Sequence, residues 1–306
     1  MSSAGRRRVL LLAPAFAALL AVLAVAWALF VDRERYDIRW KLRPRETLRY
    51  RTVQQMGSIG KESCHVSVSR YTVGTVAPDG NADVTLLQEQ TTIREGGPDG
   101  PVTWDSGSGS PPPKELPIVW AWATTGVPLK MKVDARGTIL SMEGLEAVKN
   151  RIREVLGGDL FGGFTDLPFS VRGGSFVGPP LPDGPVAQGR AWNREVGSGT
   201  PTWGSSAQVQ VYTLRDVKKG VAVISLVERR TVKRTPGDVE KALKMDESPP
   251  DPNAGSGAEE VAEFSIAEGI LLSQRDRSWT QGTLTSGKVV RFEGRSETTL
   301  IERRAP

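Results

Sequence analysis

Residues suited to nucleophilic or metal chemistry are scarce in this chain. It has one cysteine, Cys64, and one histidine, His65, which follows it directly. The surrounding residues predict a strand, in which neighbouring side chains point to opposite faces, so the two cannot meet as a nucleophile and its base. Sites built from several His and Cys ligands are excluded by the same count, as is an intramolecular disulfide. We therefore expect both residues to be structural, and we expect no metal and no cofactor.

The other catalytic motifs are missing from the sequence. Its Gly-Ser-Gly triplets at 107–109 and 197–199 lack the strand–turn–helix context of a nucleophile elbow. Its paired glycines at 157–158 and 162–163 have the wrong spacing for a phosphate-binding loop or a dinucleotide fingerprint. The stretch 251–255 lacks the glycine and the closing glutamate of a calcium loop. Only paired carboxylates stay open, because their proximity in space is invisible in a sequence. The pattern favours a protein that is not an enzyme.

Two tryptophans offer the clearest candidate for ligand binding. Trp120 and Trp122 are two residues apart, so they would share one face if this segment is a strand. Core packing is one interpretation, because aromatic residues dominate buried cores. The sharper interpretation is an apolar ligand site, in which the two rings face the apolar stripe of a helix across a sheet. Its predicted lining is Trp120, Trp122, Leu145, Val148 and Ile152.

One amphipathic helix is predicted at 142–156. Its apolar residues recur at spacings of three and four. Ser141 could cap its start, and Gly157 follows its end. A helix with a single apolar stripe must bury that stripe, and we expect it to lie against the concave face of a sheet.

Most of the remaining chain has the pattern of antiparallel strands. The turn at 78–81, Pro-Asp-Gly-Asn, predicts a hairpin between strands at 66–76 and 82–93. Alternation predicts further strands at 208–214 and 222–229, and a C-terminal hairpin at 279–284 and 289–300. Stretches rich in glycine and proline predict loops at 95–117, 172–185 and 246–259. The predicted fold class is mainly β with one or two helices: an antiparallel curved sheet or half-barrel packed on an amphipathic helix.

The chain also shows a weak internal similarity. Tyr-Thr-Val at 71–73 and the strand at 82–87 are echoed by Tyr-Thr-Leu at 212–214 and the strand at 222–227. A second matched pair is 137–141 with 269–273. We predict two similar β units, about 40–141 and 190–273, with the helix 142–156 between them. Chance similarity between amphipathic strands is the alternative.

The N-terminus has the pattern of a membrane-targeting segment. A basic stub, residues 1–8, contains Arg6, Arg7 and Arg8, and residues 9–31 carry no charge. As a helix this run would extend about 35 Å, enough to cross a bilayer. It would be an uncleaved anchor or a cleaved signal, and either places residues 32–306 on the extracytoplasmic (periplasmic) side. The chain would be membrane-anchored, or secreted if the segment is cleaved.

The charge of the remaining chain is nearly balanced. Without the three N-terminal arginines, 37 basic and 35 acidic residues remain. No later stretch clusters Lys and Arg on one face, so a nucleic-acid partner is not expected. Protein partners and oligomeric state leave no signal in the sequence.

Four short segments carry a resemblance to known proteins: Trp40–Tyr50, Val133–Ile139, Gly184–Trp192 and Glu268–Ser273. In this order they resemble a family of uncharacterised exported bacterial proteins. That domain-of-unknown-function family is similar in layout to lipoprotein-localisation factors and mycobacterial lipid-carrier lipoproteins. The resemblance, over about residues 38–300, implies an antiparallel half-barrel around helices with an apolar cavity. It implies lipid carriage only at the level of fold.

Two functions are favoured at this point, and an enzyme is a third and weaker alternative that buried carboxylates converging in a cleft would support. The chain is either a binding module that holds a lipid or another apolar ligand in the half-barrel, or a non-catalytic structural or interaction domain of the envelope. A cavity between helix and sheet would favour the first, because ligand pockets typically measure about 300 Å³ or more. A solid core would favour the second.

Overall fold

The computed structural model describes residues 34–58, 61–97, 100–112, 115–156, 175–200, 204–231, 255–283 and 289–305. Residues 36–306 group into one compact unit. None of the helices in the described ranges is both long enough and apolar enough to span a bilayer. The predicted targeting segment at 9–31 lies outside these ranges.

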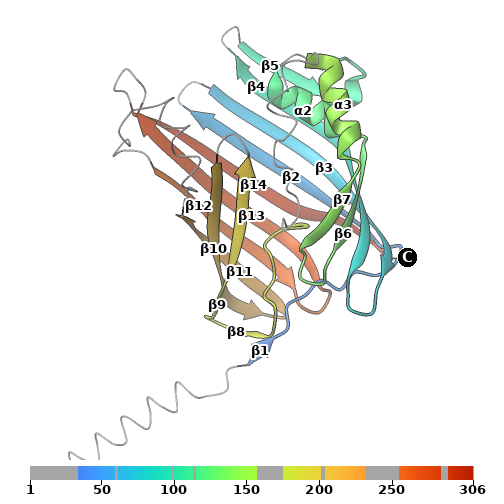
Figure 1. The fold of residues 1–306 in the computed structure, drawn as a ribbon, viewed down its shortest axis with the longest axis vertical. Helices are drawn as coiled ribbons and strands as arrows, with labels where there is room; N and C mark the ends of the chain where they lie inside the picture. Colours follow the sequence, from blue (N-terminus) through green and yellow to red (C-terminus); the bar gives the residue numbers. More distant parts are fainter. Residues whose placement is uncertain are drawn as a thin grey trace, which may run out of the picture. The chain divides into compact units, whose positions relative to one another are not determined.

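The fold is mainly β with two α-helices, as predicted (Figure 1). The helices are α2 (Leu116–Thr124) and α3 (Leu145–Leu156), and η1 (Ser106–Ser108) is a short 3-10 helix. The strands are β1 (Arg35–Tyr36), β2 (Thr47–Ser58), β3 (Lys61–Val76), β4 (Ala82–Gly97), β5 (Gly100–Asp105), β6 (Pro128–Val133), β7 (Ile139–Glu143), β8 (Val186–Ala187), β9 (Ala191–Thr200), β10 (Gly204–Lys218), β11 (Val221–Thr231), β12 (Gly255–Ser265), β13 (Ile270–Thr283) and β14 (Val289–Arg304).

Twelve of these strands form one antiparallel, curved, open sheet. Its order is β7-β6-β4-β3-β2-β14-β13-β12-β11-β10-β9, and β5 pairs with β4 beside β6. Chain neighbours are sheet neighbours from β9 to β14 and from β2 to β4. The two runs join where the C-terminal strand β14 pairs with β2. Both predicted β units therefore lie in one sheet; their internal similarity stays a prediction.

The predicted hairpins are confirmed where the structure describes them. β3 and β4 pair along most of their length. Their turn closes with a hydrogen bond from Ala77 N to Asn81 O of 2.8 Å, and Gly80 takes a φ of +86°. β10 pairs with β11, and β13 with β14.

Alternation along the strands divides the sheet into two faces, because successive side chains point to opposite sides. We call the face that carries the main hydrophobic core the inner face, and the opposite one the outer face. The core includes Leu48 and Tyr50 on β2, Ile224 on β11, Phe264 on β12 and Leu271 on β13, all at most 2% exposed. It occupies only one half of the inner face, which we call the core half.

Residues 36–42 and 176–186 cover the core half, and they are irregular except for Tyr36 in β1 and Val186 in β8. Trp40 packs edge-on against Phe176 and Phe264, with ring centroids 5.1 and 5.3 Å away. Backbone hydrogen bonds hold both segments to the turn before β7: Trp40 N donates to Ala135 O at 2.9 Å and Phe176 N to Gly137 O at 2.7 Å. Gly137 has a φ of +83°, and a Cβ there would lie 2.5 Å from Trp40 Nε1. That glycine is therefore required for the tryptophan to fit.

The helices stack as two further layers beyond the sheet. Ile118 on α2 packs against Ile93 on β4 and Trp104 on β5, all buried. The stripe of α3, Val148 and Ile152, is buried against the other side of α2. In Figure 1 both helices lie beside β4 and β5. The predicted stripe is confirmed, but its direct partner is α2, and it is α2 that contacts the sheet.

Several predicted boundaries are wrong. The segment at 117–122 is the helix α2, not a strand, because Pro117 in its first turn pre-sets the helical φ. The helix predicted at 142–156 begins at Leu145: Ser141 and Met142 belong to β7, and Gly144 separates the two elements. Neither Ser141 nor Met142 therefore has the predicted place in that helix.

The predicted loops also need correction. The stretch 95–117 contains the end of β4, all of β5 and η1, because the glycines at 96–97 and at 100 border a tight hairpin rather than a long loop. The stretch 246–259 ends in β12, which begins at Gly255, and 246–254 lies outside the described residues. Residues 175–185 are irregular, as predicted.

Candidate functional site

The inner face changes character beyond the core half. Three successive rows of cross-strand partners there carry mostly polar or small side chains. We call this region the distal half. Its rows on β2, β14 and β13 are Thr52, Thr298 and Gln274; Gln54, Ser296 and Asp276; and Met56, Gly294 and Ser278.

A pair of carboxyl groups lies in the second row. Glu260 on β12 is the direct cross-strand partner of Asp276 on β13. Burial, and then the neighbouring charge of Asp276, raise the pKa of the Glu260 carboxyl to about 7. Burial also raises the pKa of Asp276, against a hydrogen bond from Ser296 that lowers it. Oε1 of Glu260 is buried without a hydrogen-bond partner among the described residues. The pair can hold and release a proton near neutral pH.

The histidine extends the same row by one strand, from Gln54 on β2 to β3. His65 on β3 is the partner of Gln54, and its Nε2 lies 2.6 Å from Glu95 Oε1. As predicted, His65 and Cys64 point to opposite faces: Cys64 pairs with Gln55 on the outer side. The Glu95 carboxylate orients the His65 imidazole. Among the described residues, no hydroxyl or thiol group forms a hydrogen bond with that imidazole.

Two large apolar side chains are exposed at the end of the distal half. Met56 on β2 and Phe292 on β14 are 47% and 55% exposed. Met56 pairs with Gly294, two residues from Phe292 on the same face, so the two are diagonal neighbours. The inner face therefore ends in an apolar edge beside its polar rows.

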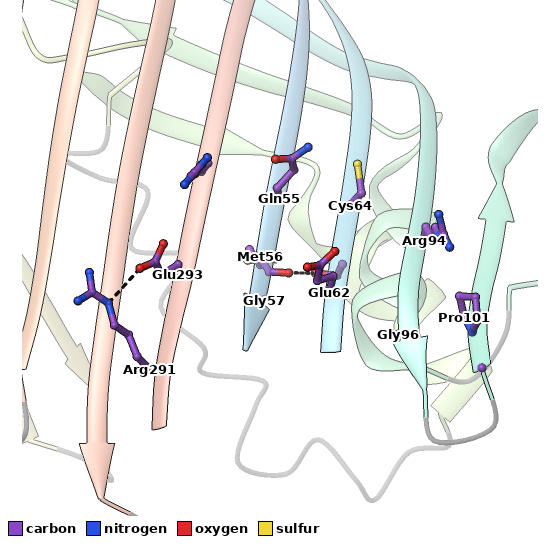
Figure 2. Close-up of a pocket in the computed structure, with 13 residues that line it drawn as sticks. Gln55, Met56, Gly57, Glu62, Cys64, Arg94, Gly96, Pro101, Arg291 and Glu293 are labelled. Atoms are coloured by element: carbon purple, nitrogen blue, oxygen red, sulfur yellow. Dashed lines mark hydrogen bonds and ion pairs between the residues drawn. The ribbon is translucent and has the colours of Figure 1, made fainter. Parts of the chain in front are cut away.

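The outer face carries a groove of about 1020 Å³ over the ends of β2, β3, β4, β5 and β14. Figure 2 shows it with Gln55, Cys64 and Arg94 on neighbouring strands, and with the ion pair between Arg291 and Glu293. Its charged lining consists of Arg94, Arg291, Arg295, Glu62 and Glu293. A second hollow of about 420 Å³ adjoins it across β14 and shares Gln55 and Arg295.

The five residues predicted to line an apolar site lie together on the two helices. Trp120 and Trp122 are half-buried on α2, in one cluster with the buried Val148 and Ile152 of α3. Arg151 stacks on the Trp122 ring at 4.5 Å. Leu145 begins α3 and is half-buried. The rings meet the stripe directly, helix to helix, rather than across the sheet, and none of the five lines the groove or the second hollow. A role in ligand binding stays a prediction.

Sequence reasoning missed the residues of the groove and of the polar rows. Each belongs to a strand whose alternation was visible, but the side chains meet only through the pairing of β14 with β2. The alternation within one strand predicts which residues share a face, but it does not predict which strand pairs with it. In the sequence, the one signal of this surface was a large apolar residue, Phe292, near the start of an otherwise mostly polar strand.

Comparison with known proteins gives little. No protein-family model matches the chain, and no curated protein is significantly similar to it. Among solved structures, one described as "lipid-protein interactions in lipovitellin" superposes with a TM-score of 0.48 and 12% identity, over 87% of this chain and 26% of that one. The chain thus spans about a quarter of the length of that protein. A similarity this weak carries no argument about function, which must be inferred from the residues of this chain.

Proposed function

We propose that this chain is a non-catalytic binding module that holds an amphiphilic ligand, such as a lipid, on the distal half of its inner face. The observation that carries the proposal is the exposure of Phe292 and of Met56, which belongs to the third row, next to the two polar rows on the same face. Large exposed apolar side chains rimmed by polar ones are typical of binding surfaces.

The two parts of the surface suit the two parts of such a ligand. An acyl chain laid on Met56 and Phe292 would remove their side chains from water, a gain of about 25 cal/mol per Å² of apolar area. A polar head group would meet the hydroxyl and amide groups of Gln54, Ser296 and Gln274, which can donate and accept hydrogen bonds. The apolar cluster of α2 and α3 lies beyond β4 and could extend the acyl-binding surface.

The place of action is part of the proposal. A segment at 9–31 that spans or is cleaved at the membrane would put this surface on the extracytoplasmic side, where lipids are exchanged between envelope components.

The test is native mass spectrometry of the full-length chain, released from detergent and followed by lipid extraction. We expect a co-purifying or added lipid on the wild-type chain, and a reduction of bound lipid of about tenfold in Phe292→Asp and in Met56→Asp, because each places a charge against the acyl chain. Both side chains are exposed, so neither variant should unfold the protein.

Ile301→Asp is the matched control, since Ile301 is 47% exposed on β14 and lies away from both sites. This control variant also keeps any lipid that is bound by the N-terminal segment. Lipid bound there can therefore be distinguished from lipid bound on the inner face. No lipid, or equal loss in all three variants, would contradict the proposal. The result would then favour a structural or protein-interaction role in the envelope.

A further inference from the structure

Arg295 stands in the outer groove without a carboxylate partner. Its direct cross-strand neighbours are Gln55 on β2 and Arg277 on β13. Like charges directly opposite each other destabilise a strand pair. The adjacent carboxylate of Glu293 is already shared, 3.3 Å from Arg277 and 3.1 Å from Arg291. Among the described residues, no ion pair or hydrogen bond uses the Arg295 guanidinium.

Arg94 repeats this situation on the other side of the groove. It is exposed on β4, opposite Cys64 on β3 and Thr103 on β5. Glu62 lies two residues before Cys64 and faces the same groove, yet it forms no ion pair with Arg94. Within the described ranges the Arg94 side chain makes no ion pair with any other carboxylate either.

Between these two arginines the groove floor carries uncharged side chains and, further along, glycines. Cys64 and Gln55 separate them in one transverse row, so the row takes three strand steps, about 14 Å. Gly57 and Gly96 follow further along the same face and add no side chain. This is a distance between strand backbones, so the two long side chains can lean toward each other over β2 and β3 and hold one small anion between their guanidinium groups.

We propose that the outer groove binds an anionic ligand through phosphate or carboxylate groups held by Arg94 and Arg295. A guanidinium presents planar pairs of N–H donors that match either oxyanion. Arg291 supplies a third cation, stacked on the Trp279 ring at 5.0 Å. A bound anion would also relieve the repulsion between Arg295 and Arg277. Both arginines are on the face opposite to the amphiphile surface, although Met56 of that surface also borders the groove.

The probe is inorganic pyrophosphate, titrated into the purified full-length chain by calorimetry at low ionic strength. Cys64, the one cysteine of the sequence, gives a second readout, because a ligand over it should slow its reaction with N-ethylmaleimide. We expect Arg94→Gln and Arg295→Gln each to weaken binding about tenfold, the value of one charge-assisted contact. Glu62→Gln should strengthen binding about twofold, since it removes a like charge from the groove.

Arg304→Gln is the control: it removes an exposed arginine of β14 that lies outside the groove and pairs with Glu302, and we expect unchanged binding. A parallel arm uses vesicles of phosphatidylglycerol against phosphatidylcholine. Pyrophosphate binding that depends on Arg94 and Arg295 supports a soluble ligand. Dependence seen only with phosphatidylglycerol supports a lipid head group. The proposal is overturned if neither probe binds, or if both arginine variants bind as the wild type does.

Discussion

The two halves of the inner face share the same strands but differ in what they bury. In the core half, β2 presents Leu48 and Tyr50 to a cover made by residues 36–42 and 176–186. In the distal half, the same strand presents Thr52, Gln54 and Met56, and Met56 is 47% exposed. The antiparallel pairing continues from one half to the other, with register shifts on the way, among them one between Glu263 and Phe264 on β12. The buried apolar packing on these strands is therefore concentrated in the core half, and the distal half leaves its side chains more open to solvent.

The strongest way to break this comparison is to remove the cover of the core half. Trp40→Ala should lower the free energy of unfolding by about 3–5 kcal/mol, because it deletes a buried ring and leaves a cavity between Phe176 and Phe264. Urea denaturation followed by fluorescence measures this. Trp279→Ala on the outer face is the control and should cost under about 1 kcal/mol. Equal losses at both positions would deny that stability is concentrated in the core half.

A second test concerns the buried ion pair at the edge of the core half. Glu46 is fully buried and pairs with Arg303 near the end of β14, while Glu268 holds the other side of that guanidinium. Arg303→Met should lower the free energy of unfolding by about 3 kcal/mol, because it leaves the buried Glu46 carboxylate with the hydrogen bond from Arg43 N and no cation. The double variant with Glu46→Gln should recover part of the loss. A double variant no better than the single one would show that the pair acts by packing alone.

The distal half should show its own pH dependence. Because the pKa of Glu260 is raised to about 7 in the fold, the unfolded chain releases this proton at lower pH than the folded one does. Stability should therefore fall as the pH rises from the ordinary glutamate value, about 4.5, to about 7. Glu260→Gln should flatten this slope and raise the free energy of unfolding at pH 8 by about 2 kcal/mol. Urea midpoints at pH 5 and pH 8 measure it, and a variant that keeps the wild-type slope would contradict the assignment.

The smallest effect is expected on the outer face. Arg295→Gln should change the free energy of unfolding by less than about 0.5 kcal/mol, and toward stability, because it removes a like charge opposite Arg277. Thermal melts at low and high salt are the measurement. A clear destabilisation would mean that Arg295 serves the fold rather than a ligand.

Much of the fold could be predicted from the sequence. The hairpin at Pro78–Asn81 and the C-terminal hairpin follow from turn chemistry and alternation, which are local properties. The α3 stripe follows from its periodicity. The helix α2 could not be found in this way, because it is apolar on almost every side and shows no stripe against a polar face.

The candidate sites were harder to predict from the sequence than the fold. Glu260 and Asp276 are 16 positions apart in the sequence, and β13 also contains Arg275 and Arg277 as apparent partners. Only the register decides that the two acids face each other on the inner side while the arginines face outward. The groove is more remote still, because Arg94 and Arg295 are brought to one face by four strands from both ends of the chain.

The pairing of β14 with β2 has a consequence for how the protein is made. The last strand of the chain, Val289–Arg304, lies in the middle of the sheet and supplies Arg303 to the buried Glu46. Both strands that flank β14, β2 and β13, precede it in the chain, so the strand between them is synthesised after both. The runs β2 to β4 and β9 to β13 can each pair among themselves, but one continuous sheet requires β14.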